Sequence, residues 1–251
     1  YGNLYTLYKE NYQLFIDYNI KDAQLVERLE EKKKLIEMVV ALAYEAKVNY
    51  QDTFGMVMMW EVILANDLMN RNIVVPPKKD NTKNAAYTGA YVKEVQAGLH
   101  NWVVSFDLNS LYPHLIMQYN ISPDTIITGV TESCRVDSLL NKQIDLNKYY
   151  DKDIIIAPNG QGFRKDIQGF LPRIMQEKYD NRVIFKKKEI AAKKKLEKET
   201  DPVEIEKLKK EADSFGNKQT AMKLMLNSVY GAFGNPYFRF FDLRISEAIT
   251  L

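Results

Sequence analysis

The sequence predicts an α+β fold, in which an antiparallel sheet with helices is joined to an antiparallel helical hairpin and preceded by a mainly helical segment. Three observations support this prediction. Apolar residues recur at helical spacing from about Leu4 to Asn70, strand and turn signals dominate from Tyr87 to Gln168, and two long helical patterns meet at Thr200-Asp-Pro202. At 251 residues the chain is long enough for one or two compact units.

The first part of the chain is predicted to be helical. From about Leu4 to Ala46 the apolar residues form a stripe made of Leu25, Leu29, Ile36, Val39, Val40 and Ala43. A further helical pattern runs from Val48 to Asn70 around Trp60. The polar, Pro-led stretch Pro76–Asn84 then reads as a linker and is the best candidate for a domain boundary.

A short apolar run, Asn101–Phe106, is predicted to be a buried strand that ends at Asp107. A carboxylate at the end of a buried strand is held rigidly and is a hard oxygen ligand of the kind Mg²⁺ prefers. Asn109-Ser110 is turn and cap chemistry leading into a helix over 111–119, whose first N–H groups can receive phosphate oxygens. The alternative is that Asp107 is only a capping residue.

Two long helices should follow. Leu171-Pro172 suits the first turn of a helix that continues to about Glu199. A second helix is expected from Val203 to about Phe233, with a candidate bend at Gly216-Asn217. At roughly thirty residues each arm would be about 45 Å long, so the two should form an antiparallel hairpin. A simple coiled coil is disfavoured by the irregular apolar spacing.

The second helix carries a group of residues suited to a nucleotide. Lys223, Asn227 and Gly231 fall at four-residue steps with Tyr230 beside them, so they share one face. Lys223 can neutralise phosphate charge, Tyr230 can stack under a base pair, and Gly231 permits close approach. The alternative is an amphipathic core helix with a solvated lysine.

The two segments Asp107-Leu-Asn-Ser-Leu-Tyr-Pro113 and Lys223-Leu-Met-Leu-Asn-Ser-Val-Tyr-Gly231 resemble, in this order, motifs A and B of the family B DNA polymerases. The stretch 231–250 is most similar to the replicative polymerases of T-even-type bacteriophages. The resemblance can be followed from about Tyr18 to Leu251. It implies a palm, which holds the sheet, and fingers, which are the helical hairpin.

The resemblance also implies a division into domains. Residues 1–45 would be the last helices of a 3′→5′ exonuclease domain, and 46–84 a helical connector and linker. Residues 85–168 would be the first part of the palm, 169–234 the fingers, and 235–251 the truncated start of the second part of the palm. Tyr87–Val92 is similar to the family's Tyr-x-Gly-Gly segment, with Ala90 in place of the second glycine.

The activity implied is template-directed transfer of a deoxynucleotide from dNTP to a primer 3′-OH, with two Mg²⁺ ions. Asp107 and Lys223 would be catalytic, and the metal would be bound by the Asp107 carboxylate and the Leu108 carbonyl. The nucleotide-binding residues would be Ser110, Leu111 and Tyr112 through their backbone N–H groups, Arg182, Lys186 and Lys223 through their charge, and Asn227, Tyr230 and Gly231. The ring of Tyr112 would also lie under the sugar and exclude a 2′-hydroxyl.

Near the start of the chain, Tyr18-Asn-Ile-Lys-Asp22 resembles the third exonuclease motif of the family. Tyr18 and Asp22 share a helix face, so one could orient a water and the other bind its metal. The family's other exonuclease carboxylates lie upstream of this motif and are absent from the sequence, so we expect no proofreading. This pair is therefore predicted to be an exonuclease remnant.

The family draws a second catalytic carboxylate from an Asp-Thr-Asp-Ser-type hairpin that follows motif B. The only Asp-x-Asp here is Asp151-Lys-Asp153, which reads as a turn feeding a strand at Ile154–Ile156. We therefore expect the chain to be inactive without a complementing palm and thumb segment. His114 replaces the serine of many relatives, and it is expected to be a surface or template-side residue rather than a ligand.

Charge and composition fit an intracellular enzyme, and the resemblance implies one that is phage-encoded and acts in the bacterial host cytoplasm. Net charge is +2, but Leu171–Lys223 holds fifteen Lys or Arg against ten Asp or Glu, a modest excess that would attract nucleotide and DNA. The single Cys134 cannot form an internal disulfide, and no membrane span or signal is visible. Expected partners are primer-template DNA, dNTP, the palm and thumb segment and a sliding clamp. The alternative function is a non-catalytic nucleic-acid-binding or assembly subunit of a split polymerase.

Overall fold

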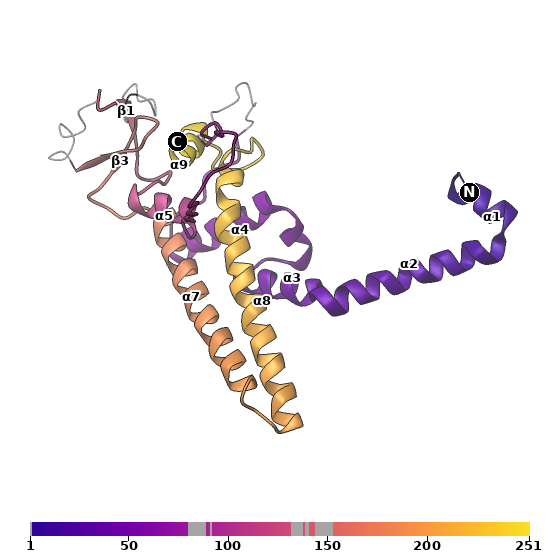
Figure 1. The fold of residues 1–251 in the computed structure, drawn as a ribbon. Helices are drawn as coiled ribbons and strands as arrows, with labels where there is room; N and C mark the ends of the chain where they lie inside the picture. Colours follow the sequence, from indigo (N-terminus) through magenta and orange to yellow (C-terminus); the bar gives the residue numbers. More distant parts are fainter. Residues whose placement is uncertain (1, 80–88, 91, 132–137, 139–140, 144–152) are drawn as a thin grey trace.

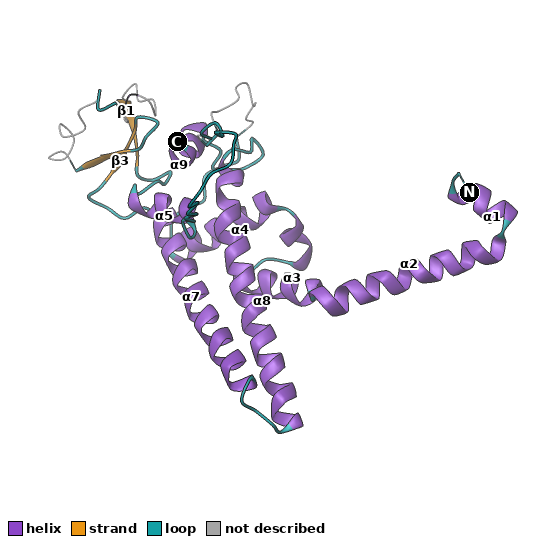
Figure 2. Cartoon of the chain, viewed as in Figure 1, coloured by secondary structure: helices purple, strands orange, loops and turns teal. Residues whose placement is uncertain are grey.

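A computed structural model of the chain describes residues 2–79, 89–90, 92–131, 138, 141–143 and 153–251. The described part is mostly helical with one small antiparallel sheet, as Figure 2 shows. The α+β class is confirmed in this coarse form. The predicted division into domains stays a prediction. Most of Pro76–Asn84 and half of Tyr87–Val92 lie outside the described residues, as do Cys134 and Asp151.

The N-terminal part consists of helices, as predicted: α1 (Leu4–Glu10), α2 (Tyr12–Lys33) and α3 (Leu35–Ala46), followed by the 3₁₀ helix η1 (Tyr50–Phe54) and α4 (Met56–Asn70). In Figure 1, α1 and α2 extend away from the rest of the molecule. No residue of α2 is buried, so Leu25 and Leu29 of the predicted apolar stripe are exposed to solvent, as are Ile36 and Val40 of α3. The buried residues of the next helix, Leu42 and Ala46, belong to the main core.

The sheet lies beside helix α5 (Leu111–Gln118) and contains β1 (Ile126–Thr131), β2 (Ile154–Ile156) and β3 (Gln161–Arg164) in the antiparallel order β1-β3-β2. Phe163 on the central strand is fully buried and pairs with Ile126 on one side and Ile155 on the other. The predicted strand at Ile154–Ile156 is confirmed.

The predicted buried strand at Asn101–Phe106 is wrong. These residues form no ladder with the described strands, and Trp102 is 98% exposed with φ at 59°, in the left-handed region. Phe106 is 91% exposed. A β-strand is stabilised by its neighbours, and none of the described strands pairs with this segment, so its β propensity alone does not make it a strand.

The predicted helical hairpin is formed by α7 (Phe170–Leu196) and α8 (Pro202–Phe233), which run antiparallel side by side in Figure 1. Pro202 occupies the first turn of α8 after Asp201, whose side chain accepts a hydrogen bond from the Val203 N–H at 3.1 Å. Helix α8 is helical throughout, including Gly216-Asn217. The rings of Phe185 and Phe215 stack across the hairpin with centroids 6.4 Å apart.

Cations complete the contact between the two arms. The Lys188 ammonium lies 5.4 Å from the Phe215 ring, and the Lys218 ammonium lies 5.5 Å from the Phe185 ring. Cation–π contacts of this kind contribute about 0.5–1 kcal/mol at exposed sites. These contacts join α7 to α8 in a part of the hairpin where many lysines are exposed to solvent.

The base of the hairpin packs into the main core. Trp60 of α4 is fully buried and its Nε1 donates a hydrogen bond to Ser228 Oγ at 3.0 Å. Met225, Val229 and Phe233 of α8 lie in the same core, and helix α9 (Leu243–Thr250) covers it further with Ile245 and Ile249. The buried face of α8 therefore fixes which of its residues point to solvent.

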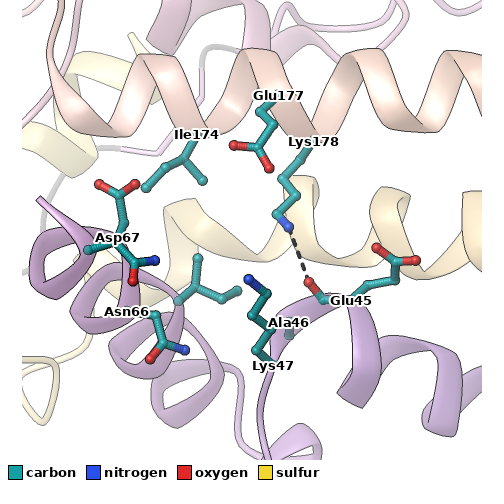
Figure 3. A pocket seen from close by; sticks show the side chains of 10 residues that line it. Glu45, Ala46, Lys47, Asn66, Asp67, Ile174, Glu177 and Lys178 are labelled. Atoms are coloured by element: carbon teal, nitrogen blue, oxygen red, sulfur yellow. Dashed lines mark hydrogen bonds between the residues drawn. The ribbon is translucent and has the colours of Figure 1, made fainter.

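A small polar pocket of about 130 Å³ lies where α3, α4 and α7 meet (Figure 3). Beside it, Lys178 Nζ donates to the Glu45 carbonyl at 3.1 Å, and Arg173 Nη2 pairs with Asp67 at 2.5 Å. The positive charges of the basic residues around this pocket are balanced by nearby carboxylates. The pocket includes no residue of the two sequence motifs, and we interpret it as a structural junction that anchors the hairpin.

Gly169 is the N-cap residue of α7 and lies at the junction between the sheet and this helix. Its N–H donates to Asn120 Oδ1 at 2.9 Å, and Asn120 Nδ2 donates to the carbonyls of Arg164 and Ile167 at 2.6 and 2.7 Å. A Cβ atom on Gly169 would lie 2.6 Å from the Ser122 Cβ. This contact leaves no room for a side chain.

Replacing Gly169 with alanine is therefore expected to lower the free energy of unfolding by about 1–3 kcal/mol, because the new methyl group overpacks a rigid junction. Chemical denaturation of the purified variant would measure the change. The matched control is Gly216→Ala within α8, where the nearest atom, Glu189 Cδ, is 3.5 Å away, an ordinary contact. That variant should be as stable as the wild type or slightly more so. Equal stability of both variants would contradict the packing argument.

Candidate functional site

The two parts of the chain singled out by the sequence meet at the start of helix α5. Arg182 of α7 donates a hydrogen bond from Nη1 to Ser110 Oγ at 2.6 Å, although the two residues are 72 positions apart. Arg182 is 9% exposed, and its Nε is buried without a hydrogen-bond partner among the described residues. The buried guanidinium of Arg182 thus lies at the N-terminus of α5. A cation and the dipole at this end of a helix both favour a bound anion.

Ser110 stands at the N-cap position of α5, but it does not cap the helix with its side chain. The predicted cap chemistry of Asn109-Ser110 is wrong in this respect, because the Ser110 hydroxyl is engaged by Arg182 and by Asn109 Oδ1 at 3.3 Å. The first N–H groups of a helix have no partner within it. Among the described residues the N–H groups of Leu111 and Tyr112 donate to no acceptor, and their predicted contact with phosphate oxygens stays a prediction.

Tyr112 and Tyr230 connect helix α5 with helix α8. Their ring centroids lie 5.3 Å apart with the planes tilted by 52°, and both half-buried rings pack against the core. The contact brings the two sequence motifs together. It also fixes the orientation of Tyr112 from two sides, since Pro113 and Ile116 of the same helix are buried.

The predicted polar face of α8 is present. Lys223, Asn227 and Gly231 are exposed, while Met222, Met225, Leu226 and Val229 face the core. An open cavity of about 570 Å³ lies against this face, lined by Asn227, Tyr230 and Gly231 together with Met56, Val57 and Asn235. Outside the backbone of its own helix, no atom of the described residues lies within 4 Å of where a Cβ of Gly231 would be, so the space above this glycine is open.

The remaining predicted residues are accessible but not joined to this cluster. Asp107, Leu108 and Lys186 are exposed, and no hydrogen bond or ion pair links Asp107 with Lys223 in the described part of the chain. Tyr18 and Asp22 are also exposed, on the protruding helix α2, and are not part of this cluster. Among the predicted site residues, Arg182 thus contacts Ser110 directly, and Tyr112 contacts Tyr230.

The donor atoms offered by Asp107 and Leu108, a carboxylate and a carbonyl oxygen, suit Mg²⁺. Among the described residues no group of three or more His, Cys, Asp or Glu side chains could hold a metal ion, so the metal role of Asp107 and Leu108 stays a prediction.

Several residues that shape the site were not singled out from the sequence. Met56 and Val57 line the cavity from the start of α4, and Tyr179 contacts His114. Tyr179 precedes Arg182 by three residues, so helical spacing could have placed it on the same face. No local sequence signal indicates Met56 or Val57, since their position depends on how α4 packs against α8.

A small antiparallel sheet beside a long helical hairpin is the arrangement that a polymerase segment would have. The chain belongs to DNA polymerase family B, whose family model matches residues 54–251. It is 31% identical to the DNA-directed DNA polymerase of Escherichia phage RB69 over 99% of this chain and 31% of that protein. It is 28% identical to the DNA-directed DNA polymerase of Enterobacteria phage T4 over 100% of this chain and 31% of that protein.

An archaeal relative also matches. DNA polymerase 1 of Pyrococcus abyssi is 31% identical over 76% of this chain and 21% of that protein. The chain therefore spans about a third or less of the length of these relatives. Within the described residues no helix is long and apolar enough to cross a membrane.

Proposed function

We propose that the chain forms the part of a DNA-directed DNA polymerase that binds the incoming deoxynucleoside triphosphate. The observation that carries this proposal is the contact between Arg182 and Ser110, which joins a buried guanidinium to the open N-terminus of α5. Guanidinium groups and free helix N–H groups are both favourable partners for phosphate oxygens. Membership of DNA polymerase family B supports the same assignment.

In this proposal the triphosphate lies at the start of α5. The backbone N–H groups of Ser110, Leu111 and Tyr112 bind its oxygens, and Arg182, Lys186 and Lys223 neutralise its charge. Arg182 needs no large rearrangement for this role, because it is already held beside Ser110. Lys186 lies one helical turn further along α7 and is exposed, so its longer, flexible side chain can approach from solvent.

The sugar and the base pair are placed against aromatic and small residues. Tyr112, held by Tyr230, would lie under the deoxyribose and exclude a 2′-hydroxyl. Asn227, Tyr230 and Gly231 line the cavity of about 570 Å³, where Gly231 leaves space for close approach of a base pair. The open face of α8 thus suits a flat, partly apolar ligand.

Asp107 and the Leu108 carbonyl would hold Mg²⁺ beside the triphosphate. Bound Mg²⁺ supplies activation of the attacking 3′-oxygen and neutralisation of the leaving phosphate in an in-line transfer. Lys223 and Arg182 neutralise the remaining charge of the transferring group. Asp107 is exposed, and no second carboxylate among the described residues joins it in a metal-binding group. We propose that a complementing palm and thumb segment completes the centre.

Primer-template DNA is the proposed macromolecular partner, and a sliding clamp is a further candidate. Tyr18 and Asp22 are proposed to be an exonuclease remnant without activity of its own in this chain. The phage relatives support action inside a bacterial host cell. The many exposed lysines of the hairpin suit a nucleic-acid backbone.

The test is reconstitution of primer extension. The chain is mixed with a complementing carboxyl-terminal polymerase segment that bears the Asp-x-Asp hairpin, and the mixture is called the assembled polymerase. The chain alone should not extend a primer, whereas the assembled polymerase should do so with Mg²⁺ and dNTP. The measurement is a primer-extension time course together with dNTP titration.

Two outcomes would contradict the proposal. Robust Mg²⁺-dependent extension by the chain alone would show that no complementing segment is needed. Binding of DNA by the assembled proteins without any dNTP binding would favour a non-catalytic, nucleic-acid-binding subunit instead.

A further inference from the structure

His114 occupies a defined place between helix α5 and helix α7. Its Nδ1 lies 2.8 Å from the carbonyl oxygen of Ser110, one helical turn earlier. A carbonyl can only accept, so Nδ1 carries the proton and donates. The ring also meets Tyr179 of α7 edge-on, with centroids 4.7 Å apart and an interplanar angle of 80°.

The contact with Tyr179 is accompanied by a second, polar contact between the same two parts of the chain. Ser110 meets Arg182, and His114 meets Tyr179, so successive turns of α5 face successive turns of α7 in antiparallel register. Residues spaced by three or four share a helix face. His114 therefore lies on the face of α5 that meets α7, one helical turn after the hydrogen bond between Ser110 and Arg182.

Ser110 needs such support because its backbone is unfavourable. Its φ of 53° and ψ of 47° lie in the left-handed region, which is unfavourable for a residue with a Cβ atom. Its carbonyl accepts both the His114 ring and the His114 backbone N–H, the latter at 3.2 Å. Two donors on one carbonyl hold the turn in the conformation that directs the Ser110 hydroxyl at Arg182.

We propose that His114 is a positioning residue for the triphosphate site: it holds the Ser110 turn and, through it, the Arg182 guanidinium. The inference rests on the proposed function and adds to it a residue that is not one of the proposed nucleotide-binding residues. His114 itself touches no substrate in this account. Its loss should therefore weaken nucleotide binding without removing any phosphate contact.

Two substitutions separate the ring from the hydrogen bond. His114→Phe keeps a ring against Tyr179 but has no donor, whereas His114→Asn keeps an amide donor close to the position of Nδ1 but has no ring. In the assembled polymerase, incorporation of dATP opposite a template thymine is measured for each. His114→Phe should raise KM for dATP about threefold to tenfold, the size of one hydrogen bond, with kcat changed less than KM. His114→Asn should stay within about twofold of the wild type for the same reason.

A double-variant comparison tests the route through Ser110. Ser110→Ala removes the acceptor for Arg182, so adding His114→Phe to it should raise KM little further. Equal KM for wild type and His114→Phe, equal damage from His114→Asn and His114→Phe, or fully additive effects with Ser110→Ala would each overturn the inference while leaving the proposed function intact. A wild-type assembled polymerase that does not use dATP would overturn the proposed function, and this inference with it. Thermal unfolding of each variant verifies that it is folded.

Discussion

Replacing Asp107 with asparagine is expected to reduce nucleotide transfer by the assembled polymerase by about 10³-fold or more. The carboxylate at the start of the motif is the proposed hard ligand for Mg²⁺, and metal-ion catalysis supplies several kcal/mol of transition-state stabilisation, with each 1.36 kcal/mol equal to a factor of ten. An amide keeps the shape but loses the charge. Single-turnover rates at saturating dNTP, measured over a range of Mg²⁺ concentrations, provide the readout.

The exposure of Asp107 makes this variant well suited to interpretation. Its side chain makes no hydrogen bond or ion pair within the described residues, so the substitution should leave the fold and its stability unchanged. The matched control is Glu206→Gln on α8, an exposed carboxylate paired with Lys210 at 2.7 Å, where activity should be normal. A rate within about tenfold of the wild type for Asp107→Asn would remove this residue from the metal centre.

Replacing Lys223 with alanine is expected to lower kcat of the assembled polymerase by about 10²- to 10³-fold, as loss of a group that stabilises developing charge generally does. Lys223 is exposed on α8 beside the open face that carries Asn227 and Gly231. Its role requires charge near the transferring phosphoryl group, and Lys223→Arg should therefore retain more activity than Lys223→Ala. Rapid-quench measurement of a single incorporation separates the chemical step from binding.

Lys209→Ala is the control for that experiment, because Lys209 is an exposed lysine of the same helix but lies nearer the tip of the hairpin. It should leave kcat unchanged. If Lys223→Ala behaved like Lys209→Ala, Lys223 would be a solvated lysine on an amphipathic helix, the alternative that its spacing leaves open.

The helical hairpin was predictable because its limits are encoded locally. Leu171-Pro172 at the start of α7 and Asp201-Pro202 at the start of α8 are short-range signals, and both helices begin within a residue of them. The polar face of α8 follows from helical periodicity alone in the same way. Such features need no knowledge of the rest of the fold.

The segment Asn101–Phe106 was not predictable in the same manner. Its composition favours a strand, but whether a strand forms depends on a neighbouring strand that the segment itself does not specify. Helix α2 makes the same point for helices, because its periodicity correctly predicts the helix and does not tell what covers Leu25 and Leu29.

The candidate site was predictable as a set of residue types and not as a set of contacts. The family resemblance implies that Ser110, Arg182 and Tyr230 belong to one site. The structure adds that Arg182 donates to Ser110 and that Tyr112 lies against Tyr230. Which hydroxyl accepts from the guanidinium depends on the left-handed turn at Ser110. The residue that this turn meets, Arg182, lies on α7, which is far from α5 in the chain.

The exposure of Trp102 has an optical consequence. The chain holds two tryptophans, of which Trp60 is 0% and Trp102 98% exposed. One indole therefore emits from a shielded, apolar surrounding and the other from water. A protein segment that covers the stretch beside Asp107 would shift the emission of Trp102 to shorter wavelength and leave that of Trp60 unchanged, so the chain carries an intrinsic fluorescent probe next to its proposed metal ligand.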